Sequence, residues 1–202
     1  MKEREKQHTK GYQIMTTKNQ LIGLMGAAGS GKDTVGEHLA VNYDYIPTAI
    51  AYAIKAMLHP LFEAVGLEEE FWEIAEDRVK KEQPIPQLGG KSFRRLAQTL
   101  GTEWGRNCVG DSIWCDIVLD RVKARQHIWP YVITDVRFEN EVQGILEAGG
   151  VIWKIERPGI ESVSAHVSES FAKVYCPDVI IQNDGTLEEL YSKVDALMKE
   201  RK

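Results

Sequence analysis

A glycine-rich segment between an apolar run and a helix-like run constrains the fold of this chain more than any other feature. Residues 26–34 read Gly-Ala-Ala-Gly-Ser-Gly-Lys-Asp-Thr, after the apolar run 21–25 and before a helical pattern that ends near Tyr43. Glycines let successive backbone N–H groups curl around an anion, and the following helix points its positive end at the same place. This order predicts a phosphate-binding loop, in preference to a flexible glycine turn of some other α/β protein.

The last residues of this loop carry the groups that would meet the phosphates. Lys32 is placed to reach the outer phosphates of a bound nucleotide as a mobile positive charge. Asp33 stands where a serine or threonine usually binds magnesium, and the hydroxyl follows one residue later, at Thr34. Two roles for Asp33 stay open at this point: support of the metal through water, or contact with the acceptor.

Composition narrows the partners to small anions. The chain has 202 residues, of which 43% are hydrophobic and 27% charged, and a net charge of −5. This charge gives no broad electrostatic grip on nucleic acid, so we expect small-molecule substrates and no stable nucleic-acid partner. No run of about 18 apolar residues occurs, so we expect no membrane association. Three cysteines without a C-x-x-C pair favour reduced thiols and a cytoplasmic location.

Apolar runs alternate with helical periodicities along most of the chain. Strands are expected near residues 21–25, 46–50, 131–134, 151–155 and 179–181, and helices near 32–43, 51–65, 69–75, 91–104, 111–126, 138–148 and 186–199. This alternation predicts an α/β fold with a parallel sheet and helices on both faces. Residues 1–19 are polar and are expected to form a disordered arm, while 20–202 form one domain. Within it, about 52–128 are mostly helical and predict a substrate-binding insertion.

A second group of charged residues follows the apolar strand at 131–134. Ligands of parallel α/β sheets lie beyond the carboxyl ends of the strands, so Asp135 is expected to face the phosphates. It holds magnesium, caps the helix that follows, or does both. Arg137 is placed to bind phosphate oxygens bidentately. Glu141, about one turn later, orients Arg137, contacts a hydroxyl, or belongs to a solvated helix face.

Polar side chains recur at helical spacing within the predicted insertion. Arg94 and Gln98 lie four residues apart, as do Gln98 and Thr102, so one face could read a base edge and a 5′-phosphate. A plain surface helix would carry the same side chains. Gly101 weakens a helix by about 1 kcal/mol relative to alanine, and close approach of a ligand is one reason to tolerate it. Trp114 is either part of the core or a stacking wall for a base.

Three segments together resemble the deoxynucleoside monophosphate kinases of bacteriophages. In chain order they read Gly-Ser-Gly-Lys-Asp-Thr, Leu-Gly-Thr-Glu-Trp-Gly-Arg and Thr-Asp-Val-Arg-Phe-Glu-Asn-Glu, and the resemblance extends over about 21–200. It implies a P-loop nucleoside monophosphate kinase fold, with a parallel sheet, a helical monophosphate-binding insertion and a lid at about 157–176. It also implies that ATP, with Mg²⁺, phosphorylates a deoxynucleoside monophosphate.

The resemblance assigns residues to each part of such a site. The nucleotide phosphates would be held by Gly29, Ser30, Gly31, Lys32, Asp33 and Thr34, with Thr186 against ATP. The metal would be bound by Thr34, Asp33 and Asp135. The residues that would line the deoxynucleotide-binding site are Lys55, Arg94, Gln98, Gly101, Thr102, Trp114, Arg137 and Glu141. Catalysis would rest on Lys32, Asp33, Asp135, Arg137 and Arg157, the last of which would close from the lid onto the transferring phosphoryl group.

Two other readings remain open. Phosphomevalonate kinase of the animal type carries a similar Gly-Lys-Asp loop, so a kinase for another small phosphorylated substrate is one alternative. A nucleotide-dependent switch is the other, although the sequence has no Asn-Lys-x-Asp motif of the kind that GTPase switches use. Apolar residues within 52–75 and 111–122 leave a homodimer open. A phage-encoded protein of this kind would act in the host-cell cytoplasm.

Overall fold

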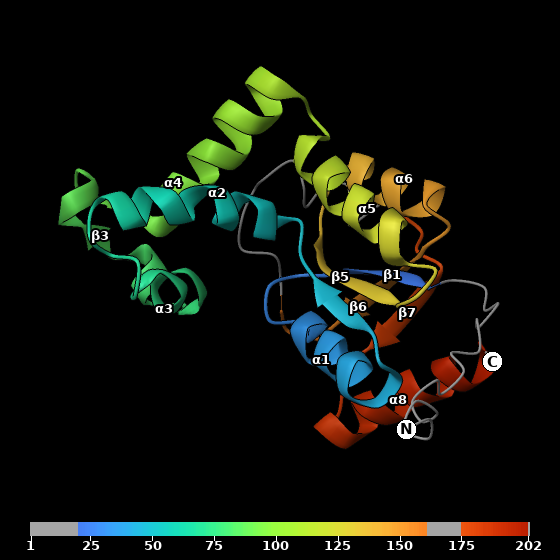
Figure 1. Ribbon diagram of the computed structural model, residues 1–202. Coiled ribbons are helices and arrows are strands. Elements are labelled where there is room, and N and C mark those ends of the chain that lie inside the picture. Colours follow the sequence, from blue (N-terminus) through green and yellow to red (C-terminus); the bar gives the residue numbers. More distant parts are fainter. Residues whose placement is uncertain (1–19, 161–174, 202) are drawn as a thin grey trace, which may run out of the picture.

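A five-stranded sheet in the order β2-β5-β1-β6-β7 forms the centre of the molecule (Figure 1). A computed structural model describes residues 20–160 and 175–201. The strands are β1 (Leu21–Met25), β2 (Ile46–Thr48), β5 (Tyr131–Val136), β6 (Val151–Glu156) and β7 (Val179–Gln182). All neighbouring strands in this sheet pair in parallel. The predicted strands and the parallel α/β architecture are therefore confirmed.

Helices cover both faces of this sheet, as the alternating pattern predicts (Figure 1). One face carries α1 (Lys32–Tyr43) and α8 (Leu187–Glu200), and the other carries α5 (Ile113–Arg125) and α6 (Glu139–Glu147). Each face has a core of its own. In the described part of the chain, no helix is both long and apolar enough to cross a bilayer.

Strand β1 shows how the two cores are divided. Successive side chains of a strand point to opposite faces. Accordingly, Leu21 and Met25 join the core that includes α5 and α6, whereas Ile22 and Leu24 join the core that includes α1 and α8. Between them Gly23 leaves no room for a side chain, since a Cβ would lie 2.8 Å from the terminal methyl of an isoleucine in α6. The loop after β1 therefore starts from a fully buried strand.

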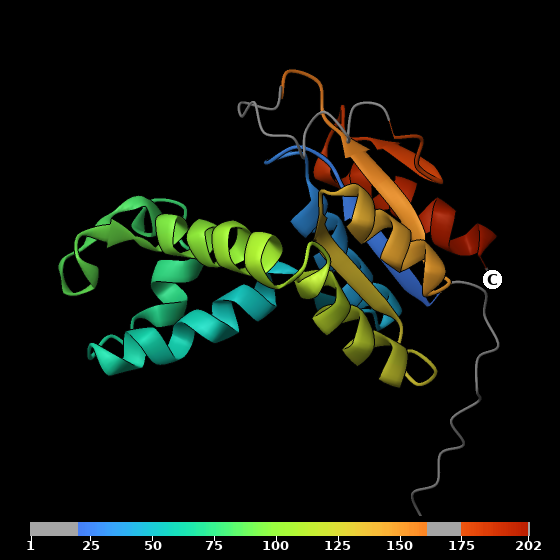
Figure 2. The same ribbon diagram turned by 90° about the horizontal axis from the view of Figure 1, so that it is seen from above.

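A mostly helical insertion projects from the sheet between β2 and α5 (Figure 2). Its elements are α2 (Ala51–Ala64), α3 (Phe71–Glu76), η1 (Lys80–Glu82), β3 (Pro84–Ile85), η2 (Pro86–Leu88), β4 (Lys91–Ser92), α4 (Phe93–Gln98) and η3 (Thr99–Val109). β3 and β4 form a small antiparallel pair. The insertion has its own core, made by Leu58, Phe62, Phe71, Ala75, Ile85 and Phe93. It is therefore packed as a lobe beside the sheet.

The insertion differs in two places from the sequence-based expectation. The projecting part ends with η3, because α5 buries Val118, Leu119 and Val122 in the core on the sheet, although the range 52–128 included this helix. The helix expected at 91–104 begins as α4 and continues as η3, which has π-helical hydrogen bonding. Apolar spacing over so few residues does not separate the α period from the wider π period.

Two of the expectations for chain organisation fall on residues that are not described. The arm at residues 1–19 lies outside the described residues. Of the lid expected at about 157–176, residues 157–160, 175 and 176 are described and 161–174 lie outside.

Candidate active site

The loop between β1 and α1 has the backbone conformation that its glycines predict. Gly29 and Gly31 have φ angles of 80° and 108°, in the left-handed region that favours glycine. A Cβ on Gly31 would lie 2.7 Å from the Nδ2 of Asn183, and that amide donates a hydrogen bond to the Ser30 carbonyl at 2.8 Å. The Ser30 hydroxyl is buried without a hydrogen-bond partner among the described residues. The chain segment after β7 therefore braces the phosphate loop from the side.

Lys32 folds back onto its own loop. Its Nζ donates hydrogen bonds to the carbonyl oxygens of the first two loop residues, both at 2.8 Å. Burial lowers the pKa of Lys32, and the positive charge of Arg137 lowers it further. The carboxylates of Asp33 and Asp135 act in the opposite direction. Three charged side chains of the predicted site thus lie within electrostatic reach of the Lys32 ammonium.

A cavity of about 350 Å³ opens beside this loop. The predicted residues on its wall are Gly29, Gly31, Lys32, Asp33, Thr34 and Arg157. Arg78 reaches the same wall from the insertion. Three cationic side chains from separate segments therefore converge here against a single acidic one, Asp33. Such an excess of positive charge at a helix N-terminus suits the phosphate groups of a nucleotide.

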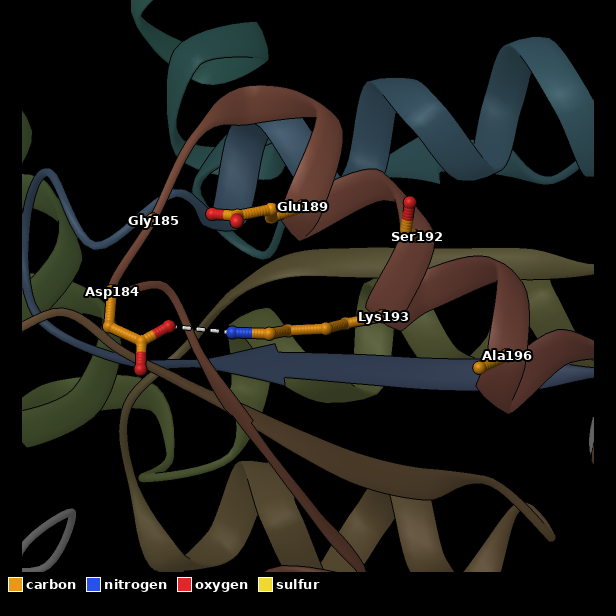
Figure 3. Close-up of a pocket in the computed structure, with 6 residues that line it drawn as sticks. All are labelled: Asp184, Gly185, Glu189, Ser192, Lys193 and Ala196. Atoms are coloured by element: carbon orange, nitrogen blue, oxygen red, sulfur yellow. Dashed lines mark hydrogen bonds and ion pairs between the residues drawn. The ribbon is translucent and has the colours of Figure 1, made fainter.

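A second hollow, larger but more open, lies along α8 (Figure 3). It has a volume of about 580 Å³ and shares Gly185 with the cavity at the loop. Lys193 and Asp184 form an ion pair at 2.6 Å across it, and Glu189 projects from the same helix (Figure 3). Because acidic groups outnumber the single lysine, this hollow does not favour phosphates. The charges therefore favour the loop cavity over this hollow as a site for phosphates.

Thr186 begins α8. Its hydroxyl accepts a hydrogen bond from the Glu189 N–H at 3.2 Å, and its own N–H donates to Glu189 Oε2 at 2.8 Å. This reciprocal arrangement is a capping box, and it fixes the start of the helix that was predicted near 186–199. The neighbours Gly185 and Leu187 line the loop cavity. Contact between Thr186 and ATP stays a prediction.

Asp135 ties the insertion to the sheet. Its two carboxylate oxygens accept hydrogen bonds from the N–H groups of Ile50 at 2.7 Å and Ala51 at 2.9 Å, where α2 begins. It therefore caps a helix far earlier in the chain, and the expectation that it caps the following helix is wrong. Burial raises the pKa of Asp135, and the two N–H groups, Arg137 and Lys55 act against this rise. Since each carboxylate oxygen keeps a second lone pair, Asp135 can still bind water or a metal.

Glu141 caps the helix that follows β5. It is 4% exposed, and its Oε2 accepts hydrogen bonds from the N–H groups of Arg137 at 2.7 Å and Phe138 at 3.0 Å. A solvated helix face is therefore wrong for Glu141, because a carboxylate that satisfies a helix N-terminus is enclosed by it. Burial raises its pKa to about 7. It fixes the backbone of Arg137, whose guanidinium remains exposed.

Four further predicted residues, Lys55, Arg94, Gln98 and Thr102, lie on the insertion and are not among the residues that line the cavity. Lys55 forms an ion pair with Glu76 at 2.7 Å, and Arg94 pairs with an acidic residue of η1. Gln98 and Thr102 are exposed. The structure thus places one group of predicted residues at the loop cavity, a second at the end of β5 and the start of α6, and a third on the insertion.

A packing contact within the protein accounts for the glycine at position 101, whereas close approach of a ligand stays a prediction. A Cβ on Gly101 would lie 2.9 Å from the Cδ1 of Ile54, and its carbonyl accepts a hydrogen bond from Trp114 Nε1 at 2.7 Å. Trp114 is 3% exposed and belongs to the core on the sheet. The buried indole therefore packs against η3 and supports it, which confirms the prediction that Trp114 is part of the core.

Among the polar side chains of the cavity wall, Arg78 and Asn183 were missed by the sequence analysis. Arg78 lies in a charged stretch after α3 that has no motif, so nothing in the sequence distinguishes it. Asn183 belongs to an Asn-Asp-Gly turn directly before Thr186, and Thr186 is the one residue of this segment to which the sequence analysis gave a role. Both reach the loop through the tertiary fold.

The oxygen ligands at the loop fit Mg²⁺. Asp33 and Thr34 line the cavity, and Asp135 lies within electrostatic reach of Lys32. Within residues 20–160 and 175–201, no cluster of three or more histidine, cysteine or acidic side chains could hold a metal by itself. Mg²⁺ commonly binds through one or two protein groups together with phosphate oxygens and water. The donors here therefore suit an ion that arrives with a nucleotide.

The parallel sheet, the glycine loop between β1 and α1 and the cationic cavity beside it define a P-loop kinase. The fold is similar to that of TT1252 from Thermus thermophilus, with a TM-score of 0.51 and 19% identity over 90% of this chain and 97% of that one. At this level of identity the similarity concerns the fold alone.

Sequence comparison identifies the family. The profile of the deoxynucleotide monophosphate kinases matches residues 85–194. A protein of Acanthamoeba polyphaga mimivirus to which that activity has been ascribed is 33% identical over 186 residues, covering 86% of this chain and 93% of its own. The deoxynucleotide monophosphate kinase of Escherichia phage RB69 is 26% identical, over 89% of this chain and 100% of its own. The chain belongs to the deoxynucleotide monophosphate kinase family.

Proposed function

We propose that this protein transfers the terminal phosphoryl group of ATP to a deoxynucleoside 5′-monophosphate, giving ADP and the diphosphate. The observation that carries this proposal is the cavity where Lys32, Arg78 and Arg157 converge on the phosphate loop. Membership of the family supports the acceptor class, and its relatives in a phage and a mimivirus support a role in supplying DNA precursors. Such a role would place the protein in the host-cell cytoplasm.

The reaction forms one bond and breaks one. An oxygen of the acceptor phosphate attacks the γ-phosphorus of ATP, and the bond from that phosphorus to the β–γ bridging oxygen breaks. The attacking oxygen is already anionic, so no strong general base is needed. The protein would act through positioning and neutralisation of charge. Lys32 would turn from the loop carbonyls to the outer phosphates, and Arg137 and Arg157 would stabilise the transferring group.

The loop and the strand end would hold the donor and its metal. The N–H groups at Gly29, Ser30 and Gly31 would surround the phosphates of ATP, as the left-handed glycines and the helix N-terminus allow. The metal ligands would be Asp33, Thr34 and Asp135, and Mg²⁺ would neutralise the phosphates when bound. Thr186 would lie near the nucleoside end of ATP, because its neighbours line the cavity.

The acceptor would lie between the loop and the insertion. Arg78 is the side chain of the insertion that lines the cavity, so it would be the first to meet an acceptor phosphate there. On the insertion, the residues proposed to reach the acceptor are Lys55, Arg94, Gln98 and Thr102. Gly101 and Trp114 would act indirectly, by shaping η3. Glu141 would act by fixing the backbone at Arg137.

A coupled ADP-release assay with every deoxy- and ribonucleoside monophosphate tests this function. We expect ADP release to depend on a deoxynucleoside monophosphate, and Lys32→Ala to abolish it because the cavity loses the mobile cation at the loop. Lys123→Ala, on the exposed surface of α5, is the matched control and should retain turnover. Circular dichroism would establish that both variants are folded. Near-normal turnover of folded Lys32→Ala would contradict the proposed site.

The same assay separates the alternatives. Response to phosphomevalonate alone would assign another small-molecule kinase, and slow hydrolysis of ATP without stimulation by any acceptor would assign a switch. We further propose a homodimer, for which the support is the exposed apolar side chains of α2 and α3, including Tyr52, Met57, Leu61 and Trp72. Light scattering would measure the molar mass, and a monomer at micromolar concentration would contradict it.

A further inference from the structure

Arg106 joins the end of the insertion to the start of α6. It lies on η3, and its side chain is 14% exposed. Its guanidinium contacts the Asp111 carboxylate at 2.9 Å, the Asn140 side-chain oxygen at 3.1 Å and the Glu141 carboxylate at 3.6 Å. Its central carbon lies 3.9 Å from the centre of the Phe138 ring. The guanidinium thus contacts four groups. Three of them, Phe138, Asn140 and Glu141, lie at the start of α6.

The contacts of Arg106 extend through Glu141 to the segment that follows β5. The Glu141 carboxylate that faces Arg106 with one oxygen uses its other oxygen to accept the N–H groups of Arg137 and Phe138. Arg137 is in turn within electrostatic reach of Asp135 and Lys32. A path of direct contacts therefore leads from Arg106 through Glu141 to the backbone that carries the Arg137 guanidinium.

We propose that Arg106 is a positioning residue, which holds the Glu141 carboxylate against the N–H groups of Arg137 and Phe138 and thereby keeps Arg137 in place for phosphoryl transfer. This inference rests on the proposed function, because Arg137 has its role through that reaction. Arg106 does not line the cavity as described, so it acts through Glu141. A neutral Glu141 would be a weaker acceptor for the two N–H groups, since charge-assisted hydrogen bonds are the stronger ones.

The charges around Glu141 give the direction of the effect. Burial raises the pKa of Glu141 most strongly, and Asp135 on β5 raises it too, whereas the two N–H groups and, to a smaller extent, Arg106 on η3 lower it. Cys115 faces the same carboxylate from α5, and its own pKa is raised to about 12, so it stays neutral. Arg106 is the cation that opposes protonation of Glu141. Its removal should therefore raise the pKa of Glu141 from a value of about 7.

Three variants test the role of Arg106. In Arg106→Gln we expect kcat with ATP and a deoxynucleoside monophosphate to fall by about tenfold or more, because small displacements of catalytic groups are costly, with KM for ATP unchanged. The acid limb of the kcat–pH profile should move to higher pH. Arg106→Lys keeps the charge and should restore the limb, although the lost fork and ring contact leave kcat below that of the wild type. Arg121→Gln, an exposed charge change on α5, should change neither property.

A spectroscopic titration separates positioning from support of the fold. The carboxyl carbon of Glu141, followed by NMR against pH, should titrate at higher pH in Arg106→Gln and near the wild-type midpoint in Arg106→Lys. In a Glu141→Gln background, Arg106→Gln should no longer move the acid limb. If the midpoint and the limb keep their wild-type positions in Arg106→Gln, even with a lower Tm, the proposal is overturned.

Failure of the proposed function would look different. In that case the wild-type protein would release no ADP with any nucleoside monophosphate. The NMR midpoint of Glu141 would still be measured in all variants, and an unmoved midpoint would refute the electrostatic role of Arg106 independently of turnover.

Discussion

Gly105 is the position where a single methyl group should reveal how tightly the insertion is joined to the sheet. A Cβ there would lie 2.4 Å from both the Cζ2 and Nε1 atoms of Trp114. The indole cannot move aside easily, because it is buried and donates its N–H to the Gly101 carbonyl at 2.7 Å. Gly105 has no positive φ, so alanine would face a steric cost without backbone strain.

Three contributions set the size of the effect of Gly105→Ala. Forcing a methyl group into a packed core costs about 1–3 kcal/mol. Pulling the indole N–H off its buried acceptor costs about 1–3 kcal/mol more where the bond is lost completely. Alanine returns about 1 kcal/mol through its better helix propensity. We therefore expect the free energy of unfolding to fall by about 2 kcal/mol, which lowers Tm by about 4–8 °C in a domain of this size.

Urea unfolding, followed by tryptophan fluorescence and far-UV circular dichroism, measures this change. Gly110→Ala is the matched control, since a Cβ at Gly110 meets nothing within 4 Å and its φ of 171° is ordinary extended backbone. The control should be close to neutral. A Trp114→Phe background makes room, so Gly105→Ala should cost less there than in the wild type. Equal or greater stability of Gly105→Ala in the wild-type background would refute the packing argument.

Two further predictions concern charged groups of the site. The pKa of Glu141 is raised from an ordinary 4.5 to about 7 in the fold, so the folded state binds a proton more tightly than the unfolded state. The free energy of unfolding of the wild type should therefore decline as pH rises between these values. Urea unfolding at pH 5 and pH 8 should show this decline in the wild type and little of it in Glu141→Gln. Arg78→Gln should lower kcat/KM for the acceptor by about tenfold or more, because Arg78 lines the cavity and would bind a phosphate there. Its Tm should stay unchanged, because Arg78 is exposed and supports no core. Steady-state kinetics with unchanged kcat/KM would exclude Arg78 from the site.

The sequence was sufficient for those features that depend on neighbours along the chain. The phosphate loop, the strand before it, the helix after it and the helix near 186–199 follow from local spacing and from the conformations that glycine allows. The same holds for the parallel sheet, because alternating strands and helices leave few other topologies.

The features that the sequence did not predict depend on contacts between distant segments. Arg78 and the phosphate loop meet only because the insertion folds back towards the sheet. Capping of the following helix was one of the roles left open for Asp135, whereas the N–H groups that it accepts belong to Ile50 and Ala51. The packing of Gly101 against Ile54, which lies on another helix, also has no signal in the sequence. Each of these contacts joins segments whose separation in the chain carries no periodic signal.

The position of Asp135 means that one carboxylate joins the start of α2 to the end of β5. A nucleotide or metal that draws on this carboxylate would also change how firmly α2 is anchored, because both demands fall on the same two oxygens. Binding of the donor and the orientation of the insertion would then be coupled, so that a change in one would change the free energy of the other. Substituting Asp135 would consequently disturb the affinity for the acceptor as well as the chemistry, so lost activity in such a variant would report on two events at once.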